Sequence, residues 1–313
     1  MKFIQDYREG DRVFDIYLCK HKQAATTKNG KPYENVILQD KTGTIDAKVW
    51  EPNSMGIEDY DSLDYIEVYG EVTSFQGALQ VNVKRIRRCS EGEYDPANYL
   101  PVSSKNIDEM YTELLGYVQK IQEPHIKELL ESFFVKDEEF VKAFKNSSAA
   151  KSVHHGFVGG LLEHTLSVTK LCEYYTIAYP ALNKDLLLAS AMLHDIGKIR
   201  ELSFFPENDY TDAGQLLGHI VMGSEMVACK ASQMKDFPTK LLFYIKHCIL
   251  SHHGELEYGS PKKPAIMEAV ALNFADNTDA KMQTFTEILN TSNETGWLGY
   301  NRLFESNITK TTY

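Results

Sequence analysis

Long apolar runs are missing from this chain of 313 residues. No stretch approaches the roughly 18 consecutive apolar residues that a membrane helix needs. Residues 1–10 contain no apolar segment of the kind that forms the centre of a signal peptide. These absences argue against a membrane-spanning or exported protein, and we expect a cytoplasmic protein with no membrane partner.

Cysteine is scarce and follows no pattern. The five cysteines are odd in number, widely spaced and without a C-x-x-C pair, which argues against a disulfide framework and against a zinc ribbon. We expect them to be reduced thiols. They are Cys19, Cys89, Cys172, Cys229 and Cys248.

Positive charge is also in short supply. The chain has 33 Lys and Arg against 44 Asp and Glu, a net charge of -11, whereas nucleic-acid binding draws much of its affinity from neutralised phosphates. The total excludes nothing by itself, because a bound metal or a local basic stretch can outweigh it. The one dense basic stretch is 84–88, which fits either a solvated strand end or a phosphate contact.

The first part of the chain has the pattern of a small β-barrel. Residues 36–40 and 44–50 flank a Lys-Thr-Gly turn and predict a hairpin, and residues 66–72 and 79–84 alternate in the same way around a turn at 75–77. Within 44–50, the alternation places Ile45, Ala47 and Val49 inside and Trp50 outside. Five strands over residues 1–90 predict an OB-like, nucleic-acid-binding barrel.

Several aromatic residues fall on or near the polar side of these strands. In that position they can stack on the bases of a single strand, or they can pack at the rim of the barrel, and the pattern leaves both open. They are Trp50, Tyr65, Tyr69 and Phe75.

The second part of the chain reads as helices. Proline, glycine and acidic residues interrupt every period over 91–105, which predicts a linker. From 106 to about 290 the apolar residues recur at helical spacing, so residues 106–313 predict an all-α domain. The polar tail 307–313 is expected to be frayed unless it packs on a neighbouring subunit.

One apolar helix carries the chemistry. Residues 185–193 read as a buried helix that runs directly into His194 and Asp195, and Gly197 is of the type that ends a helix in the left-handed conformation. A buried carboxylate is costly unless it is paired or binds a metal. The pair therefore calls for partners elsewhere in the chain.

Those partners occur in a recognisable order. A single histidine on an apolar helix is more often a core residue than a ligand, but the ordered set resembles the HD-domain superfamily of metal-dependent phosphohydrolases. The set is His164, His194, Asp195, His219, His252, His253 and Asp276.

The phrase at 152–165, H-H-x-x-x-G-G-L-L-E-H-T with its preceding residues, narrows the resemblance. Behind an OB-like barrel it resembles the YhaM-type 3′-to-5′ exoribonucleases, over nearly the whole chain and including 194–198 and 276–281. The resemblance implies a first metal site of His164, His194, Asp195 and Asp276. It implies a second site that shares Asp195 and uses the remaining histidines, with His252, His253 or both as ligands.

This ligand set implies two divalent ions. Mixed imidazole and carboxylate ligands suit manganese, iron, cobalt, nickel or magnesium better than a tetrahedral thiolate zinc site does. Of these metals we expect manganese. Two such ions can activate a water and stabilise the leaving oxygen, which makes Asp195 essential to catalysis without a side-chain nucleophile. Asp279, one helical turn after Asp276, is expected to support the ligands or to be solvated.

Two further residues are candidates for catalysis and phosphate binding. Lys198 can bind a phosphate oxygen, although a lysine at a helix C-terminus is also favourable for dipole reasons alone. His155 can donate to the same phosphate, or it can simply cap its own turn.

Three functions follow from these features. The first is a 3′-to-5′ exoribonuclease that releases nucleoside 5′-monophosphates from single-stranded RNA, with single-stranded DNA as a possible substrate. The second is an HD enzyme acting on a small nucleotide or a cyclic dinucleotide, against which the barrel counts. The third is a binding protein with a degenerate HD domain, against which the complete ligand set counts. A homo-oligomer stays open.

Overall fold

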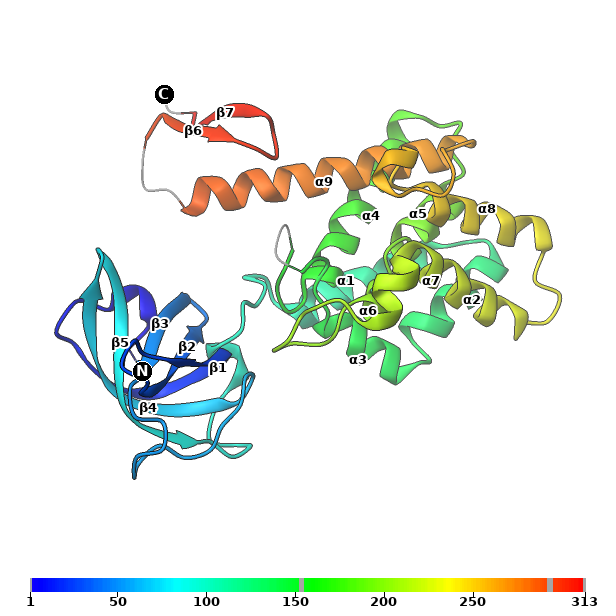
Figure 1. Cartoon of the computed structure of the whole chain (residues 1–313). Helices are drawn as coiled ribbons and strands as arrows, with labels where there is room; N and C mark the ends of the chain where they lie inside the picture. The colour runs from blue at the N-terminus through cyan, green and yellow to red at the C-terminus, as the bar shows by residue number, and fades with distance from the viewer. Residues whose placement is uncertain (1, 152–154, 292–294, 312–313) are drawn as a thin grey trace. The chain divides into compact units, whose positions relative to one another are not determined.

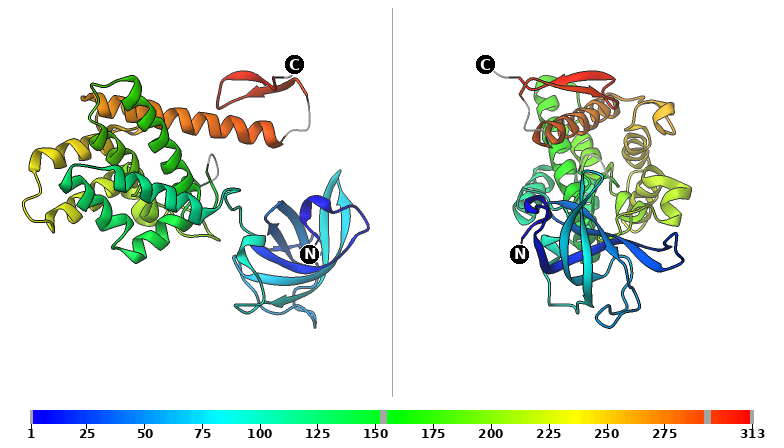
Figure 2. Two further views of the ribbon diagram at one scale, coloured as in Figure 1. Left: turned by 180° about the vertical axis from the view of Figure 1, so that it is seen from behind. Right: turned by 60° about the vertical axis from the view of Figure 1, so that its left-hand side comes forward.

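The protein forms two compact units, which a computed structural model describes over residues 2–151, 155–291 and 295–311 (Figure 1). The first unit comprises Met1–Val102 and the short loop Phe204–Asp209. The second comprises Ser103–Ser203 and Tyr210–Tyr313. The strands of the first unit precede the helices of the second, as the blue-to-orange colouring in Figures 1 and 2 shows.

The first unit is a closed five-stranded barrel of the OB type. Its strands are ordered β1-β2-β3-β5-β4, with β1 closing on β4, β3 parallel to β5 and the other neighbours antiparallel. The strands are β1 (Arg12–Thr26), β2 (Pro32–Asp40), β3 (Gly43–Val49), β4 (Tyr65–Phe75) and β5 (Ala78–Arg88).

Alternation along the strands fills the barrel as the sequence predicts. Ile45, Ala47 and Val49 are buried, and Tyr60, from the turn segment between β3 and β4, completes the interior with its hydroxyl donating to Glu34. The outward side chains of Trp50, Tyr69 and Phe75 are 47%, 44% and 60% exposed. Exposed aromatic rings on a polar strand face are available to a ligand.

Tyr65 departs from the predicted alternation. It is buried, because the chain beyond β5 turns back and stacks Tyr94 on it with the ring centroids 3.7 Å apart, while Tyr99 packs edge-on. This cover comes from residues about 30 positions downstream, so strand periodicity cannot reveal it. Its buried ring offers no exposed stacking surface, unlike the three outward rings.

The basic stretch at the end of β5 is largely neutralised. Arg87 pairs with Glu67 at 3.1 Å and Glu93 at 2.9 Å, and Arg88 pairs with Asp64 at 2.7 Å. Of the two alternatives, a solvated strand end describes Arg87 and Arg88 better than a phosphate contact, because both are engaged in surface ion pairs.

The second unit is helical around one apolar core. Its centre is formed by the helices Gly160–Ala178 and Lys184–Leu193. The second of these is buried from Leu186 to Leu193, which confirms the predicted buried helix. The helices are α1 (Ile107–Lys120), α2 (Pro124–Phe134), α3 (Glu138–Asn146), α4 (Gly160–Ala178), α5 (Lys184–Leu193), α6 (Lys198–Glu201), α7 (Asp212–Ser232), α8 (Thr239–Ser251) and α9 (Met267–Thr291).

The end of the chain is more ordered than its composition predicts. Ser306–Thr309 forms β7 and pairs antiparallel with β6 (Trp297–Asn301), and Ile308 is buried. The prediction of a frayed tail is therefore wrong for these residues. These residues are ordered because they form a short hairpin, whose turn is capped by Asn301 accepting from the Leu303 N–H. The composition of such a polar turn resembles that of a disordered segment.

Across the described ranges, none of the helices combines the length and the apolar character needed to cross a membrane.

Candidate metal centre

Several helices contribute side chains to one polar cluster inside the helical unit. The α4 helix contributes His164, α5 ends at His194 with Asp195 following, α7 contributes His219, and α9 contributes Asp276. His252 directly follows α8, and His253 comes next. Residues spread over more than a hundred positions are thereby gathered on rigid elements.

The first group of donor atoms surrounds His164. Its Nε2 lies 3.2 Å from His194 Nε2, 3.2 Å from Asp276 Oδ1 and 3.4 Å from Asp195 Oδ2. Ligands about 2.0–2.2 Å from one ion lie about 3 to 3.5 Å from each other. The spacing of these four side chains is that of one coordination sphere.

The second group gathers at the other oxygen of Asp195. Its Oδ1 lies 3.4 Å from His219 Nε2 and 3.6 Å from His252 Nε2. His219, His252 and His253 offer ligand atoms within 4.8 Å of one another. Asp195 thus directs one oxygen to each group, and the structure brings both His252 and His253 into the second.

Each of these histidines is oriented by its Nδ1 atom. His194 donates to the carbonyl of Ala191 at 2.8 Å, His252 to that of Ile249 at 2.7 Å and His253 to that of Tyr258 at 2.9 Å. His164 and His219 use carboxylates instead, donating to Asp279 at 2.7 Å and to Glu201 at 2.9 Å. With the proton on Nδ1, each Nε2 carries a bare lone pair, which is the form that binds a metal.

Several of these atoms are left unsatisfied by the protein. Among the residues that the structure describes, Asp195 Oδ1, His219 Nε2 and His252 Nε2 are buried without a hydrogen-bond partner. A buried polar atom without a partner is costly, and lone pairs that converge repel one another. A divalent cation would give these atoms a partner and remove the repulsion between their lone pairs, so the donor set fits metal binding.

The protonation states of His252 and Asp195 suit a metal. Burial lowers the pKa of His252 well below its usual value, so that the ring is neutral. Burial by itself would raise the pKa of Asp195, but the Lys198 ammonium beside it holds the pKa well below its usual range. Neutral imidazole and ionised carboxylate are the states that coordinate divalent ions. Burial by itself would lower the pKa of His164, but its contacts with Asp195, Asp276 and Asp279 raise the pKa well above its usual value, so at this ring a cation would replace a proton.

Gly197 is important for a different reason from the one predicted. Its φ is -63°, so it is right-handed and does not end α5 in the left-handed conformation. A Cβ at this position would lie 2.0 Å from the carbonyl oxygen of His219 and 2.8 Å from the N–H nitrogen of Gly223. Glycine is required because α7 packs directly against the turn that contains Gly197. This contact joins distant segments, so the residues that mark helix ends do not predict it.

The structure places the two candidate phosphate-binding residues at the cluster. Lys198 donates to Asp195 Oδ2 at 2.7 Å. His155 is buried with a φ of 61°, and its Nε2 donates to Asp279 at 3.0 Å. Residues 152–154 of the same sequence phrase lie outside the described residues. Asp279 therefore accepts from both His155 and His164, in keeping with a supporting carboxylate.

Glu163, the neighbour of His164, anchors the segment around Ser103 and Lys105, where the helical unit begins. Its carboxylate is buried and accepts from Ser103 Oγ at 2.5 Å and Lys105 Nζ at 2.8 Å.

Glu201 is a site residue that the sequence analysis missed. Its Oε1 accepts both from the His219 backbone N–H at 3.0 Å and from the His219 ring at 2.9 Å. This double contact is possible because α7 breaks at Gly218, which has a φ of 73° and a ψ of 156°. The sequence offered one signal of this break, the glycine directly before His219. Nothing in the sequence marks Glu201, 18 positions earlier, as the partner of that histidine.

We expect Glu201→Gln to weaken one metal site selectively. Loss of the carboxylate that orients a ligand histidine costs about 10- to 100-fold in metal affinity, and Glu201 touches only the second donor group among the described ligands. Titration calorimetry with Mn²⁺ measures the two affinities.

The matched variant is Asp279→Asn, which removes the equivalent support from His164. It should weaken the other site. Equal losses at both sites in both variants would contradict this division of roles.

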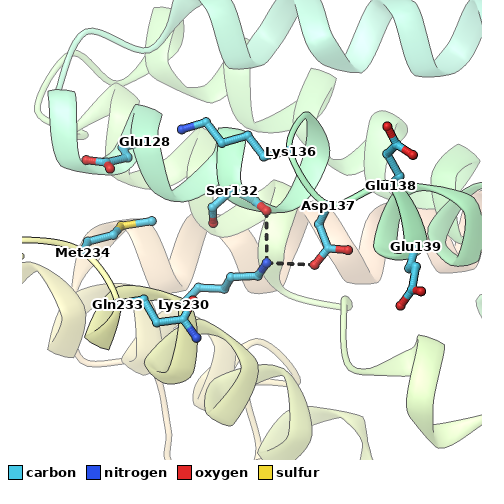
Figure 3. A pocket seen from close by; sticks show the side chains of 9 residues that line it. All are labelled: Glu128, Ser132, Lys136, Asp137, Glu138, Glu139, Lys230, Gln233 and Met234. Atoms are coloured by element: carbon cyan, nitrogen blue, oxygen red, sulfur yellow. Dashed lines mark hydrogen bonds and ion pairs between the residues drawn. The ribbon is translucent and has the colours of Figure 1, made fainter.

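The cluster opens into a pocket of about 530 Å³, whose wall includes Asp195, Lys198, His253, Asp276 and Lys281. A second pocket of about 600 Å³ lies between α2, α3 and α7 (Figure 3). There Lys230 donates to Asp137 at 2.8 Å and to the Ser132 carbonyl at 3.2 Å, among glutamates. No histidine occurs among its described lining residues, so it lacks the chemistry of the first pocket.

Comparison with known proteins agrees with the helical part of this description. Residues 161–281 match the HD domain family model, and this match spans all seven residues of the ordered ligand set. The chain thus contains an HD domain, which indicates a metal-dependent phosphohydrolase.

Among solved structures, the chain is similar to the second OB-fold domain of replication protein A from Methanococcus maripaludis, with 18% identity over 30% of this chain and 98% of that one and a TM-score of 0.24. It is also similar to a replication protein A heterotrimer bound to ssDNA, with 17% identity over 28% and 65% of the two chains and a TM-score of 0.22. The OB-type description of the barrel rests on its strand order.

Proposed function

We propose, starting from the HD domain at residues 161–281, that this chain is a 3′-to-5′ exoribonuclease of the YhaM type. Its substrate is single-stranded RNA, with single-stranded DNA as a second polymer, and its products are nucleoside 5′-monophosphates. The observation that carries the proposal is Asp195, a buried carboxylate with one oxygen toward each of two histidine groups. That arrangement suits two divalent ions, of which manganese is the first choice.

The protein residues have separate tasks in this reaction. Asp195 bridges the two donor groups, His164, His194 and Asp276 complete the first, and His219, His252 and His253 complete the second. Bound divalent ions would supply Lewis acidity at the phosphoryl group and lower the pKa of the attacking water. Lys198, whose ammonium already lies in the pocket, neutralises a phosphate oxygen.

His155 shares the carboxylate of Asp279 with His164. With Nε2 donating to Asp279, its buried Nδ1 has no hydrogen-bond partner among the described residues. This atom is the part of the ring that remains available to a phosphate oxygen or to the departing 3′ oxygen.

The barrel supplies the reason to propose a polymer as substrate. Trp50, Tyr69 and Phe75 present exposed rings, and stacking on such rings binds single strands without sequence preference. Phe14 packs against Tyr69 with ring centroids 4.1 Å apart, so these two rings form one aromatic area. We propose residues 1–90, covered by Tyr94 and Tyr99 from the predicted linker 91–105, as the binding domain and residues 106–313 as the catalytic domain.

A substrate panel tests this function. Purified protein with Mn²⁺ is given 5′-labelled RNA and DNA of about 30 nucleotides, long enough to span an OB-type site, as well as a trinucleotide and a cyclic dinucleotide. We expect a descending ladder from the long RNA, 5′-monophosphates by chromatography, and a lower KM for long RNA than for the trinucleotide. Tyr69→Ala should raise only the KM for long RNA.

Other outcomes would decide against the proposal. Immediate release of the labelled terminal nucleotide, internal cuts or 3′-monophosphates would contradict the direction and chemistry. Preferential hydrolysis of the cyclic dinucleotide would favour the alternative, an HD phosphodiesterase for small nucleotides.

A further inference from the structure

An uncharged pocket adjoins the metal pocket. It measures about 630 Å³ and lies between the C-terminal end of α4 and the N-terminal half of α9. Its walls include Tyr175, Tyr179, Met267, Val270 and Phe274, and no charged side chain occurs among its described lining residues. Tyr179, Met267 and Phe274 are 59%, 51% and 58% exposed, which is much apolar surface for one place on a monomer.

Phe274 belongs to both pockets. It lines the apolar pocket and also the metal pocket, and it lies two positions before Asp276 on the same helix. Because side chains at spacings of three and four share one helix face, Met267, Val270 and Phe274 continue toward Lys281. One face of α9 therefore passes from an apolar wall to Lys281, a cation that lines the metal pocket. Asp276, about 200° further round the helix than Phe274, lines the same pocket from its flank.

The charge distribution along this face matches the end of a nucleic-acid strand. The terminal nucleotide of a 3′ end has a phosphate on one side only, and beyond that phosphate it presents an uncharged sugar and base. The remaining strand carries a negative charge at every linkage and suits the side of Lys198 and Lys281. An uncharged, aromatic-lined pocket suits the terminal base.

We infer that the apolar pocket binds the base of the nucleotide that is released, with Phe274 contacting that base at the boundary of the metal pocket. The inference rests on the proposed function and adds a base subsite to it. Stacking on an aromatic ring accepts any base, and the hydroxyls of Tyr175 and Tyr179 both donate and accept hydrogen bonds, so the subsite requires a base without selecting one.

The test compares two RNA oligonucleotides that differ only at the 3′-terminal residue, which carries either a base or a reduced abasic ribose. Stacking of one base is worth about tenfold or more. Wild-type protein should therefore cleave the intact end about tenfold more efficiently, in kcat/KM, than the abasic end. Phe274→Ala should lose about tenfold on the intact end and little on the abasic end, which brings the ratio close to one.

Binding provides a readout that does not depend on turnover. Wild-type protein should bind a nucleoside 5′-monophosphate about tenfold more tightly than ribose 5-phosphate, and Phe274→Ala should bind the two alike. Val270→Asp, which places a charge in the same pocket, is the second variant should Phe274→Ala fold poorly. Phe243→Ala on α8, which removes an aromatic ring of similar exposure outside the pocket, should retain the wild-type ratios.

The outcomes separate the two levels of the hypothesis. If the wild type cleaves neither end, or yields other products, the proposed function fails. If it cleaves both ends equally well to 5′-monophosphates, the function stands and the base subsite is wrong. Equal losses on both ends in Phe274→Ala would also overturn the subsite, because they indicate a displaced Asp276.

Discussion

Asp195→Asn should lower RNA hydrolysis by at least about 1,000-fold and reduce the metal content of the protein. The loss of an outer carboxylate costs about 10- to 100-fold, and Asp195 lies closer to the chemistry, with an oxygen toward each donor group. The amide keeps the shape of the side chain but removes the charge that two cations would share. Steady-state rates and metal analysis of the purified variant measure both effects.

A matched control isolates the role of the metal. Asp137 also pairs with a lysine, at 2.8 Å from Lys230, against 2.7 Å between Asp195 and Lys198. Asp137→Asn removes a comparable ion pair away from the histidines and should leave hydrolysis near the wild-type rate. Full activity of Asp195→Asn in metal-supplemented buffer would refute the assignment of Asp195.

Removing metal with a chelator should abolish hydrolysis and lower the thermal stability of the helical unit. A ligand that binds only the native state stabilises it by about 2.7 kcal/mol at a hundred times its dissociation constant. For a unit of this size that corresponds to about 5 to 10 °C in Tm. The buried, unpartnered atoms of Asp195, His219 and His252 give the physical reason, because metal binding relieves them.

Adding Mn²⁺ back should restore both properties, and parallel additions of cobalt, nickel, magnesium and, without oxygen, ferrous iron rank the metals. Calorimetry and the ladder assay measure stability and activity in the same samples. An unchanged Tm together with unchanged activity after exhaustive chelation would show that the donor cluster holds no functional metal.

The sequence predicts those parts of the structure that depend on local periodicity. The apolar run before His194 predicts a buried helix, and strict alternation around Ala47 predicts its place inside the barrel, because both patterns follow from the geometry of a single element. The order of ligand-type residues suggested the cluster through its resemblance to a known superfamily. Distances within the cluster come only from the fold.

What could not be predicted depends on contacts between distant segments. The role of Gly197 is set by the close approach of α7, and the burial of Tyr65 is set by Tyr94. Glu201 faces His219 only because α7 breaks at Gly218. No local pattern marks these residues. The role of each depends on a contact with a distant segment, whereas propensity and periodicity describe only neighbouring residues.

His194 and His252 have a second task that bears on how such chains diverge. Each directly follows a helix, and each donates to a carbonyl in the last turn, that of Ala191 or Ile249. Those carbonyls have no partner within their own helix. A descendant that had lost the reaction could still keep both histidines for these hydrogen bonds at the helix ends, so neither histidine alone marks an active copy. His219 and Asp276, which lie within helices rather than at their ends, are therefore the better markers by which to tell active from inactive relatives.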